Sequence, residues 1–218
     1  KLNKNFQREE REMFDLGAAA HTLMLGKGAR FAVVNFDDWR TKDARAQRDE
    51  ARAAGMTPIL AADMIEVEAM VAAGRAQLAE HEEGRLACRD GEAEEIDSWQ
   101  ESNGVWCRVM CDYVTRRSAP QFIWDYKTTG GSANPDVWGN GQLFDRGYDV
   151  QAAFYLRSFE AQFRFVVQEN KPPYALSVVA LSPAALGMAE RKVERAIELW
   201  GECLKSGNWP GYNSVTVT

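Results

Sequence analysis

The sequence lacks any long apolar run. No stretch approaches the ~20 apolar residues that a helix needs to cross a bilayer, so we expect no membrane span. The opening residues, KLNKNFQREEREMF, also lack the apolar centre of a secretory signal, which indicates a cytoplasmic protein. With 218 residues and 45% hydrophobic content, the chain suits one compact domain, residues 1–218, with a substantial core.

Cysteine is scarce, and its four positions exclude two kinds of cross-link. A disulfide framework is not expected in a cytoplasmic chain of this size with cysteines at 88, 107, 111 and 203. Cys107 and Cys111 fall in one expected strand, where four steps span roughly 13 Å, too far for two ligands of one small iron–sulfur cluster. We therefore interpret the cysteines as structural thiols.

An excess of basic residues is also missing, because the formal net charge is −6. Residues 80–101 hold nine acidic residues and two arginines, a local charge of −7, so the remaining chain is close to +1. This balance argues against a protein that coats DNA regardless of sequence. It still allows nucleic-acid binding where basic groups gather along one groove.

Apolar periodicity and turn residues predict the order of elements. The predicted helices are 8–26, 43–55, 57–81, 143–168 and 182–205, and the predicted strands are 91–100, 104–114, 120–129 and 174–181. The segment 132–141, rich in Gly, Pro and Asn, is expected to be a loop. The three central strands form a meander, and the last strand requires a parallel neighbour. The sequence therefore predicts an α/β fold with a mixed sheet flanked by helices, a mainly helical part at 1–85 and a core at 91–206.

Two aspartates and a lysine follow apolar stretches of the second and third central strands. Asp125 and Lys127 project from the same face of a strand, roughly 6–7 Å apart at the backbone. Asp112, on the adjacent hairpin strand, reaches the same place because neighbouring strands lie about 4.8 Å apart. Two carboxylates so close repel each other unless positive charge lies between them. Hard divalent cations with oxygen ligands and retained waters suit that position.

The spacing and its context resemble the PD-(D/E)xK nuclease superfamily. Asp112 is followed by twelve residues and then by Asp125-Tyr126-Lys127. The segment GAAAHTLML resembles the amino-terminal helix motif of the superfamily, whose metal-binding histidine falls on His21. This sequence has Cys111 where the superfamily name expects proline, and Asp125 is the accepted alternative to glutamate.

Further motifs extend the resemblance over roughly residues 12–210. GEAEEIDSW and GVWCRVMCD resemble the first two core strands, with Glu94 as the accessory acid, although strand register could place Glu95 there instead. DVQAAFYLRSFEAQF resembles the helix after the active strand, whose Q-x-x-x-Y pair falls on Gln151 and Tyr155. WDYKTT with VQAAFY is especially similar to the exonuclease VIII (RecE) and lambda-exonuclease branch.

The resemblance implies a restriction-endonuclease-like core and the activity of a 5′-to-3′ exodeoxyribonuclease of phage or prophage origin. It would act on linear double-stranded DNA ends and leave 3′ overhangs for a single-strand-annealing recombinase, working as a homo-oligomeric ring. Its implied cofactor is one or two Mg²⁺ ions, for which Mn²⁺ would substitute, held by His21, Asp112, Asp125 and the Tyr126 carbonyl. Lys127 would then position or activate the attacking water.

The sequence also offers candidate DNA contacts and alternative interpretations of single residues and of the function. The candidates for contacts to the DNA backbone are Thr128, Thr129, Arg116, Arg117, Arg146 and Arg157. Taken alone, His21 would be a buried structural histidine, and Asp112 would pair with Arg116 or Arg117. Trp138 would either stack on a base or cover a helix end. The alternatives in function are an endonuclease or repair-type exonuclease of the same superfamily, and a catalytically silent module that binds DNA ends.

Overall fold

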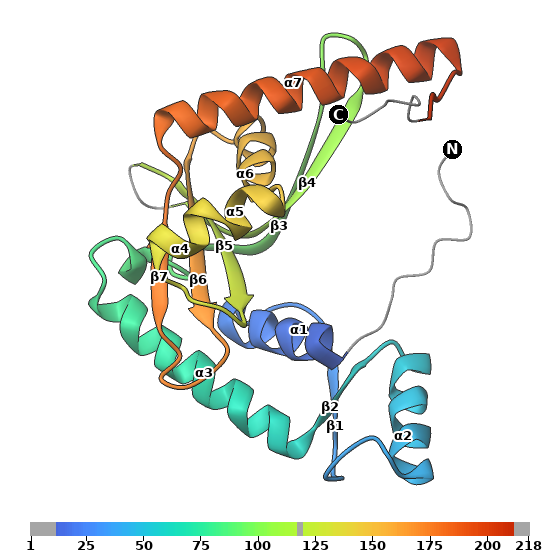
Figure 1. The fold of residues 1–218 in the computed structure, drawn as a ribbon. Helices are drawn as coiled ribbons and strands as arrows, with labels where there is room; N and C mark the ends of the chain where they lie inside the picture. Colours follow the sequence, from blue (N-terminus) through green and yellow to red (C-terminus); the bar gives the residue numbers. More distant parts are fainter. Residues whose placement is uncertain (1–11, 117–119, 212–218) are drawn as a thin grey trace, which may run out of the picture.

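The computed structural model describes residues 12–116 and 120–211 (Figure 1). Its centre is a five-stranded sheet in the order β3 (Gly91–Gln100), β4 (Trp106–Thr115), β5 (Phe122–Thr129), β6 (Gln162–Glu169) and β7 (Leu176–Val179). β5 and β6 are parallel and the other neighbours are antiparallel. The mixed sheet predicted from the sequence is therefore confirmed.

Helices cover both faces of the sheet (Figure 1). α1 (Glu12–Leu25) and α3 (Ala61–Glu80) lie on one face, and α4 (Pro135–Asn140), α5 (Gln142–Asp145) and α6 (Tyr148–Leu156) lie on the other. The long helix α7 (Pro183–Ser206) packs on α6, and Ser182 caps it by accepting a hydrogen bond from the Ala185 amide.

The alternation of side chains along β5 builds two separate cores. Trp124 and Tyr126 pack with α1 and α3, whereas Ile123 packs with α4 to α6. Because successive residues of a strand point to opposite faces, Asp125 points toward α6. An acidic residue thus stands at a position where the neighbouring residues of the same face are core.

A buried glutamine ties α3 to the sheet. Gln168 of β6 donates to the Met70 carbonyl at 2.8 Å and accepts from the Tyr126 hydroxyl at 2.7 Å, and its side chain is fully buried. Gly74 of α3 lies against it, since a Cβ at position 74 would meet the Gln168 amide at 2.6–2.9 Å. The absence of a side chain at position 74 is therefore what allows α3 to lie this close.

The amino-terminal part is less helical than predicted. β1 (Phe31–Val34) and β2 (Thr57–Leu60) form a small parallel sheet connected by α2 (Lys42–Ala53). The prediction of one helix over 57–81 is wrong at its start, because Thr57–Leu60 pairs with β1 and the helix begins only at Ala61. A short 3₁₀ helix, Gly84–Leu86, then leads into β3.

The prediction of one helix over 143–168 is also wrong. The helical part ends with α6 at Leu156, and Gln162–Glu169 forms β6, which pairs in parallel with β5. The prediction that the last strand has a parallel neighbour is therefore wrong, because β7 pairs antiparallel with β6. The segment Phe163–Val167 is aromatic and β-branched, and most of it is buried, which favours a central strand. The predicted loop at 132–141 contains the short helix α4.

Two other expectations can be compared with the structure. None of the helices in the described ranges is long and apolar enough to cross a bilayer. All four cysteines are free thiols, and burial raises the pKa of Cys88 to about 11 and that of Cys111 to about 12, consistent with structural residues.

Candidate active site

The site lies where two strands of the sheet separate. β4 pairs with β5 only through Tyr113–Thr115, opposite Phe122–Trp124. The next residues beyond the last pair are Asp112 on β4 and Asp125 on β5, which the twelve intervening residues place opposite each other. We call this point the fork.

The Asp112 carboxylate occupies the place of the missing strand neighbour. Its Oδ2 accepts a hydrogen bond from the Tyr126 backbone N–H at 2.9 Å, a group that a continued β4–β5 ladder would satisfy through a carbonyl. Buried backbone donors need such a partner. The alternative in which Asp112 pairs with Arg116 does not hold for the described residues, because Arg116 forms its ion pair with Glu95.

Asp125 is completely buried on the α6 side of the fork. Gln151 Nε2 donates to its Oδ1 at 2.5 Å, and Lys127 forms an ion pair with its Oδ2. Burial and the charge of Asp112 raise the pKa of Asp125 to about 6, although Lys127 and Gln151 oppose this shift. Additional positive charge beside this carboxyl group would stabilise its ionised form.

Lys127 lies between the buried acid and an aromatic ring. Its ammonium is 4.9 Å from the centre of the Tyr148 ring, and its side chain is largely covered. Burial acts to lower the pKa of Lys127, but the charges of Asp125 and Asp112 outweigh burial and raise it. Lys127 is therefore held as a cation, which suits it to stabilise negative charge in the site.

His21 reaches the fork from the other face of the sheet. Its Nε2 lies 3.0 Å from Asp112 Oδ2. Burial acts to lower the pKa of His21, and the hydrogen bond with Asp112 together with the charge of Asp125 raises it overall. The small residues of the GAAAH segment explain the placement, because Ala19 and Ala20 are fully buried and allow α1 to lie close to the sheet.

The residues at the fork suit a divalent cation in kind. Two carboxylates and an imidazole converge there, and the pKa of one of the two acids, Asp125, is raised. Hard cations prefer carboxylate oxygens as ligands. In this arrangement His21 and Lys127 supply the neutralising charge. Within the described ranges no three His, Cys, Asp or Glu side chains are already arranged around one ion position. Binding of an ion between the carboxylates would therefore require these side chains to rearrange.

The predicted helix pair of the site lies in α6. Gln151 positions Asp125, and Tyr155 follows one turn later and packs edge-on against Phe163. Burial raises the pKa of Tyr155, and its hydrogen bond with Gln151 acts in the opposite direction. Tyr148, which the sequence reasoning missed, lies one turn before Gln151 on the same helix, and that spacing was the available signal.

The two glutamates of β3 have different surroundings. Glu94 has a positive φ of 50° and lies at the register position opposite Asp112, where the β3–β4 ladder is interrupted. Glu95 forms an ion pair with Arg116. In the described part of the chain, neither forms a hydrogen bond or ion pair with Asp112, Asp125 or Lys127. The assignment of Glu94 as the accessory acid stays a prediction.

The candidate DNA contacts are spread around the site. Arg157 forms two hydrogen bonds with Glu101, at 2.8 and 2.7 Å, so its guanidinium is already engaged. Arg146 is exposed at the end of α5, and Arg117 lies outside the described residues. Thr129 is buried and accepts a hydrogen bond from Gln142 at 3.1 Å. Any contact of these residues with DNA remains a prediction.

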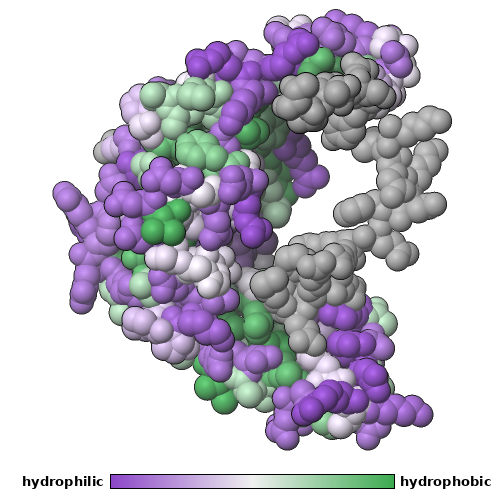
Figure 2. Space-filling view, viewed as in Figure 1, coloured by the Kyte–Doolittle hydropathy of each residue, from purple (hydrophilic) through white to green (hydrophobic). Residues whose placement is uncertain are grey.

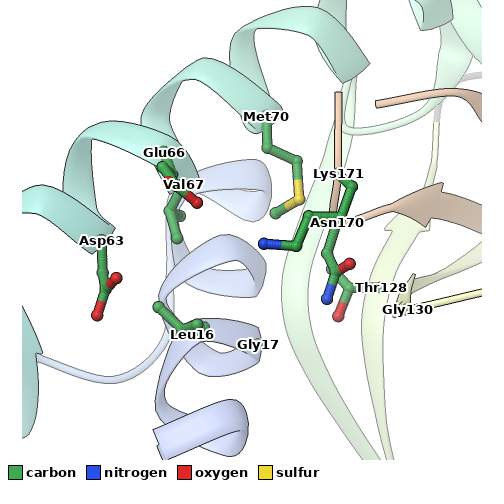
Figure 3. Close-up of a pocket in the computed structure, with 10 residues that line it drawn as sticks. All are labelled: Leu16, Gly17, Asp63, Glu66, Val67, Met70, Thr128, Gly130, Asn170 and Lys171. Carbon is green, nitrogen blue, oxygen red and sulfur yellow. The ribbon is translucent and has the colours of Figure 1, made fainter. Parts of the chain in front are cut away.

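A small cavity adjoins the site on the α1 side (Figure 3). Its volume is about 120 Å³, and Thr128, the residue after Lys127, lies in its wall. Asp63 and Glu66 of α3 line it beside Lys171 and Asn170 from the turn between β6 and β7 (Figure 3).

Trp138 is buried and stacked on Tyr148, so the hypothesis that it stacks on a base is wrong.

The comparison with known families agrees with this geometry. A family described as "PDDEXK-like domain of unknown function (DUF3799)" matches residues 1–215. The chain belongs to this family. The PD-(D/E)xK resemblance found in the sequence is thereby confirmed, and so is the restriction-endonuclease-like fold class.

This PDDEXK-like chain is similar in fold to solved structures. It is similar to a "Putative exonuclease" from Eubacterium rectale, with a TM-score of 0.58 and 13% identity over 95% of this chain and 72% of that one. SSO0001 matches at 16% identity over 88% of each chain with a TM-score of 0.33, which carries no argument. No curated protein matches.

Proposed function

We propose that this PDDEXK-like protein is a metal-dependent deoxyribonuclease that digests linear double-stranded DNA from its 5′ ends. The fork carries the proposal: Asp112 and Asp125 lie opposite each other where β4 and β5 separate, with His21 and Lys127 beside them. A structural ion pair alone would not need a fully buried aspartate between Trp124 and Tyr126. The fold shared with the "Putative exonuclease" from Eubacterium rectale supports the interpretation as an exonuclease.

In the proposed reaction each side chain has a limited task. Asp112, Asp125 and His21, with the Tyr126 carbonyl, would hold Mg²⁺ or Mn²⁺, which polarises the scissile phosphate and lowers the pKa of a bound water. Lys127 remains a cation and stabilises the negative charge that develops on the phosphate oxygens. Gln151 orients the Asp125 carboxylate, and Tyr155 supports Gln151.

The resemblance to the exonuclease VIII and lambda-exonuclease branch supports the finer parts of the proposal. These are the 3′ overhang as product, a single-strand-annealing recombinase as partner and a closed ring as the working assembly. A ring would gather the few basic groups of this acidic chain around one DNA axis. Light scattering that gives the mass of a monomer at assay concentration would remove the ring from the proposal.

One experiment separates the proposed function from its alternatives. Linear duplex labelled at either its 5′ or its 3′ ends is digested with Mg²⁺, in parallel with a covalently closed circle. Early release of the 5′ label with an intact circle supports the proposal. Cutting of the circle indicates an endonuclease. If neither substrate is cut while DNA ends are still bound, the chain is a silent end-binding module.

A further inference from the structure

Beyond the fork, β3 and β4 continue as a ribbon of two strands with one uncovered face. We call residues Ile96–Gln100 and Trp106–Met110 the outer ribbon. On its inner face Trp99 packs against Phe154, and Asp97 accepts a hydrogen bond from Ser158, so this side is covered by α6 and the residues that follow it. These contacts attach the outer ribbon to α6 and the residues after it, and no other residue of the described ranges 12–116 and 120–211 covers its opposite face.

The uncovered face consists of three cross-strand pairs. They are Ile96–Met110, Ser98–Arg108 and Gln100–Trp106, and all six residues are exposed. Trp106 is 69% exposed, although a tryptophan at a strand position is usually buried. The Arg108 side chain forms no hydrogen bond or ion pair with any residue that the structure describes. A large apolar surface with one uncommitted cation indicates a binding face.

This face begins at the fork and leads away from it. Along β4 the exposed residues Met110, Arg108 and Trp106 follow Asp112 at steps of two residues, each roughly 7 Å. Trp106 therefore stands roughly 20 Å from the fork. In Figure 1 the outer ribbon extends from the sheet under α7, and in Figure 2 exposed apolar residues border the recess below that helix.

A groove lies beside the far end of this face, between β4 and the helices α6 and α7. It has a volume of about 280 Å³, and its lining includes Trp106, Cys107 and Arg108 of β4, Phe154 of α6, and Ile197 and Trp200 of α7. Trp200 is itself partly exposed. The groove thus combines two tryptophans with an arginine, the side chains on which unpaired bases stack.

We propose that the outer ribbon and this groove bind a single strand of nucleic acid that extends from the fork. Ile96 and Met110 form an apolar step against the first unpaired base, Arg108 contacts a phosphate, and Trp106 stacks on a base near the groove. The inference rests on the proposed function in one respect: cleavage at the fork would set the direction from which the single strand reaches the outer ribbon.

Charge favours a single strand over a duplex. A duplex presents phosphates outward, and proteins bind it through many lysines and arginines. The uncovered face offers one arginine, Arg108, among apolar and neutral side chains, in a chain with a net charge of −6. Unpaired bases, which expose their flat faces, gain most from such a surface.

The test compares the affinity for a dye-labelled 12-nucleotide single strand with that for a 12-base-pair duplex, both in EDTA so that nothing is cut. Trp106→Ala is expected to weaken single-strand binding roughly tenfold, because stacking on an aromatic side chain is worth ~1–3 kcal/mol per base. Duplex binding should stay within about twofold. Phe144→Ala, which removes an exposed aromatic residue from α5, is the matched control.

A salt titration tests the phosphate contact separately. Arg108→Ala should reduce the slope of log K against log salt concentration by ~0.7 for the single strand, the value for one phosphate. The control is Arg195→Ala on α7, whose side chain pairs with Glu198. An unchanged slope removes Arg108 from the proposed path.

The proposal fails if Trp106→Ala binds the single strand within twofold of the unaltered chain, or if it loses duplex and single strand equally. A change in sedimentation of this variant without any loss of oligonucleotide affinity would mean that the face contacts another protein chain, which also overturns the proposal. Failure of the proposed function looks different, because then no DNA is cut with Mg²⁺ while the Trp106→Ala effect on single-strand binding persists.

Discussion

Lys127 and Asp125 neutralise each other in a place where the aspartate is fully buried and the lysine is largely covered. The ammonium is held by the buried carboxylate and by the Tyr148 ring, and the charges around it keep it protonated. Such a cation stabilises charge that develops nearby more effectively than a surface lysine, because little solvent screens it. The residue therefore acts through electrostatics and need not accept a proton.

Replacing Lys127 by alanine is expected to lower the rate of DNA hydrolysis by roughly 10²–10³-fold or more. DNA binding should remain, since phosphate contacts elsewhere supply most of the affinity. Single-turnover digestion of labelled duplex, paired with a binding titration in EDTA, measures both. Lys205→Ala, at the exposed end of α7, is the control. Near-normal turnover of Lys127→Ala would show that the catalytic assignment is wrong.

Gln151 acts on the site through Asp125. Its amide donates to Asp125 Oδ1 at 2.5 Å, so Gln151→Ala leaves the acid with a less fixed orientation. Outer partners of this kind change metal affinity or activity by roughly 10–100-fold when removed. We expect the Mg²⁺ concentration for half-maximal activity to rise by that factor, with most of the maximal rate restored at high Mg²⁺. A lower maximal rate at unchanged Mg²⁺ dependence would instead place Gln151 in contact with the DNA.

At the scale of elements, the contact between α3 and β6 depends on a glycine. A Cβ at position 74 would meet the Gln168 amide, which is held by hydrogen bonds at both ends and cannot move cheaply. Gly74→Ala is therefore expected to destabilise the protein by roughly 1–3 kcal/mol. Gly187 of α7 has no such neighbour, so Gly187→Ala should stabilise it by roughly 0.5–1 kcal/mol. Urea unfolding measures the change in the free energy of unfolding for both variants, and changes of the same sign would contradict this account.

The Glu101–Arg157 pair fastens the turn of the outer ribbon to the end of α6. The hydrogen bonds from Arg157 hold the pKa of Glu101 below its usual value of 4.5. A carboxyl group with a lowered pKa in the folded state contributes stability above the unfolded pKa, and that contribution is lost as the pH falls through the folded pKa. The pair should therefore matter at pH 7 and lose its effect at acidic pH.

Glu101→Gln is expected to cost about 1 kcal/mol at pH 7, a fall in Tm of roughly 2–4 °C, and the difference should shrink as the pH falls below 4.5. Thermal unfolding between pH 3.5 and 7.5 measures this dependence. The control is Glu160→Gln, which changes an exposed acid after α6. If Glu101→Gln instead strengthens DNA binding at unchanged Tm, the released Arg157 contacts DNA as the sequence predicted.

The comparison of sequence and structure is also clearest for elements. β3 to β5 were predicted within a few residues, because turn residues separate clear strand patterns. β6 was missed because Ser158–Gln162, between α6 and the strand, contains neither glycine nor proline to mark the end of the helix. β2 was missed because Thr57–Leu60 leads directly into α3, so one apolar pattern continued across two elements.

The site was predictable where residues are adjacent in the hairpin. Asp112 and Asp125 oppose each other because of a fixed spacing, and Gln151 follows from the helical pattern. The partners of arginines were not predictable, because Glu95 and Glu101 reach Arg116 and Arg157 only through the twist of the sheet and the packing of α6. The positive φ of Glu94 likewise has no signature in the sequence.

At the scale of the whole molecule, the two opposed carboxylates make the folded state responsive to divalent cations. Asp125 has a pKa raised from 3.8 to about 6, so without a cation this group makes folding less favourable as the pH rises from about 4 to about 6. A bound cation must displace that proton. Its stabilising effect should therefore be small at pH 5 and fully developed above pH 7.

Mg²⁺ at ten times its dissociation constant is expected to stabilise the protein by about 1.4 kcal/mol, or roughly 3–6 °C in Tm at pH 7.5. The shift should shrink at pH 5, and Asp112→Asn should largely abolish it at both values. Differential scanning calorimetry with Mg²⁺ and with EDTA checks this prediction. An equal Mg²⁺ response in Asp112→Asn would remove Asp112 from the metal site.

The fork also limits how this protein can lose its activity in evolution. Because the carboxylate at position 112 completes the backbone hydrogen bonding of β5, a descendant that abandons hydrolysis still needs an acceptor oxygen there. Asparagine keeps that oxygen without the charge, whereas alanine would leave the Tyr126 backbone N–H without its acceptor. Relatives that bind nucleic acid without cutting it should accordingly carry asparagine at this position more often than small apolar residues.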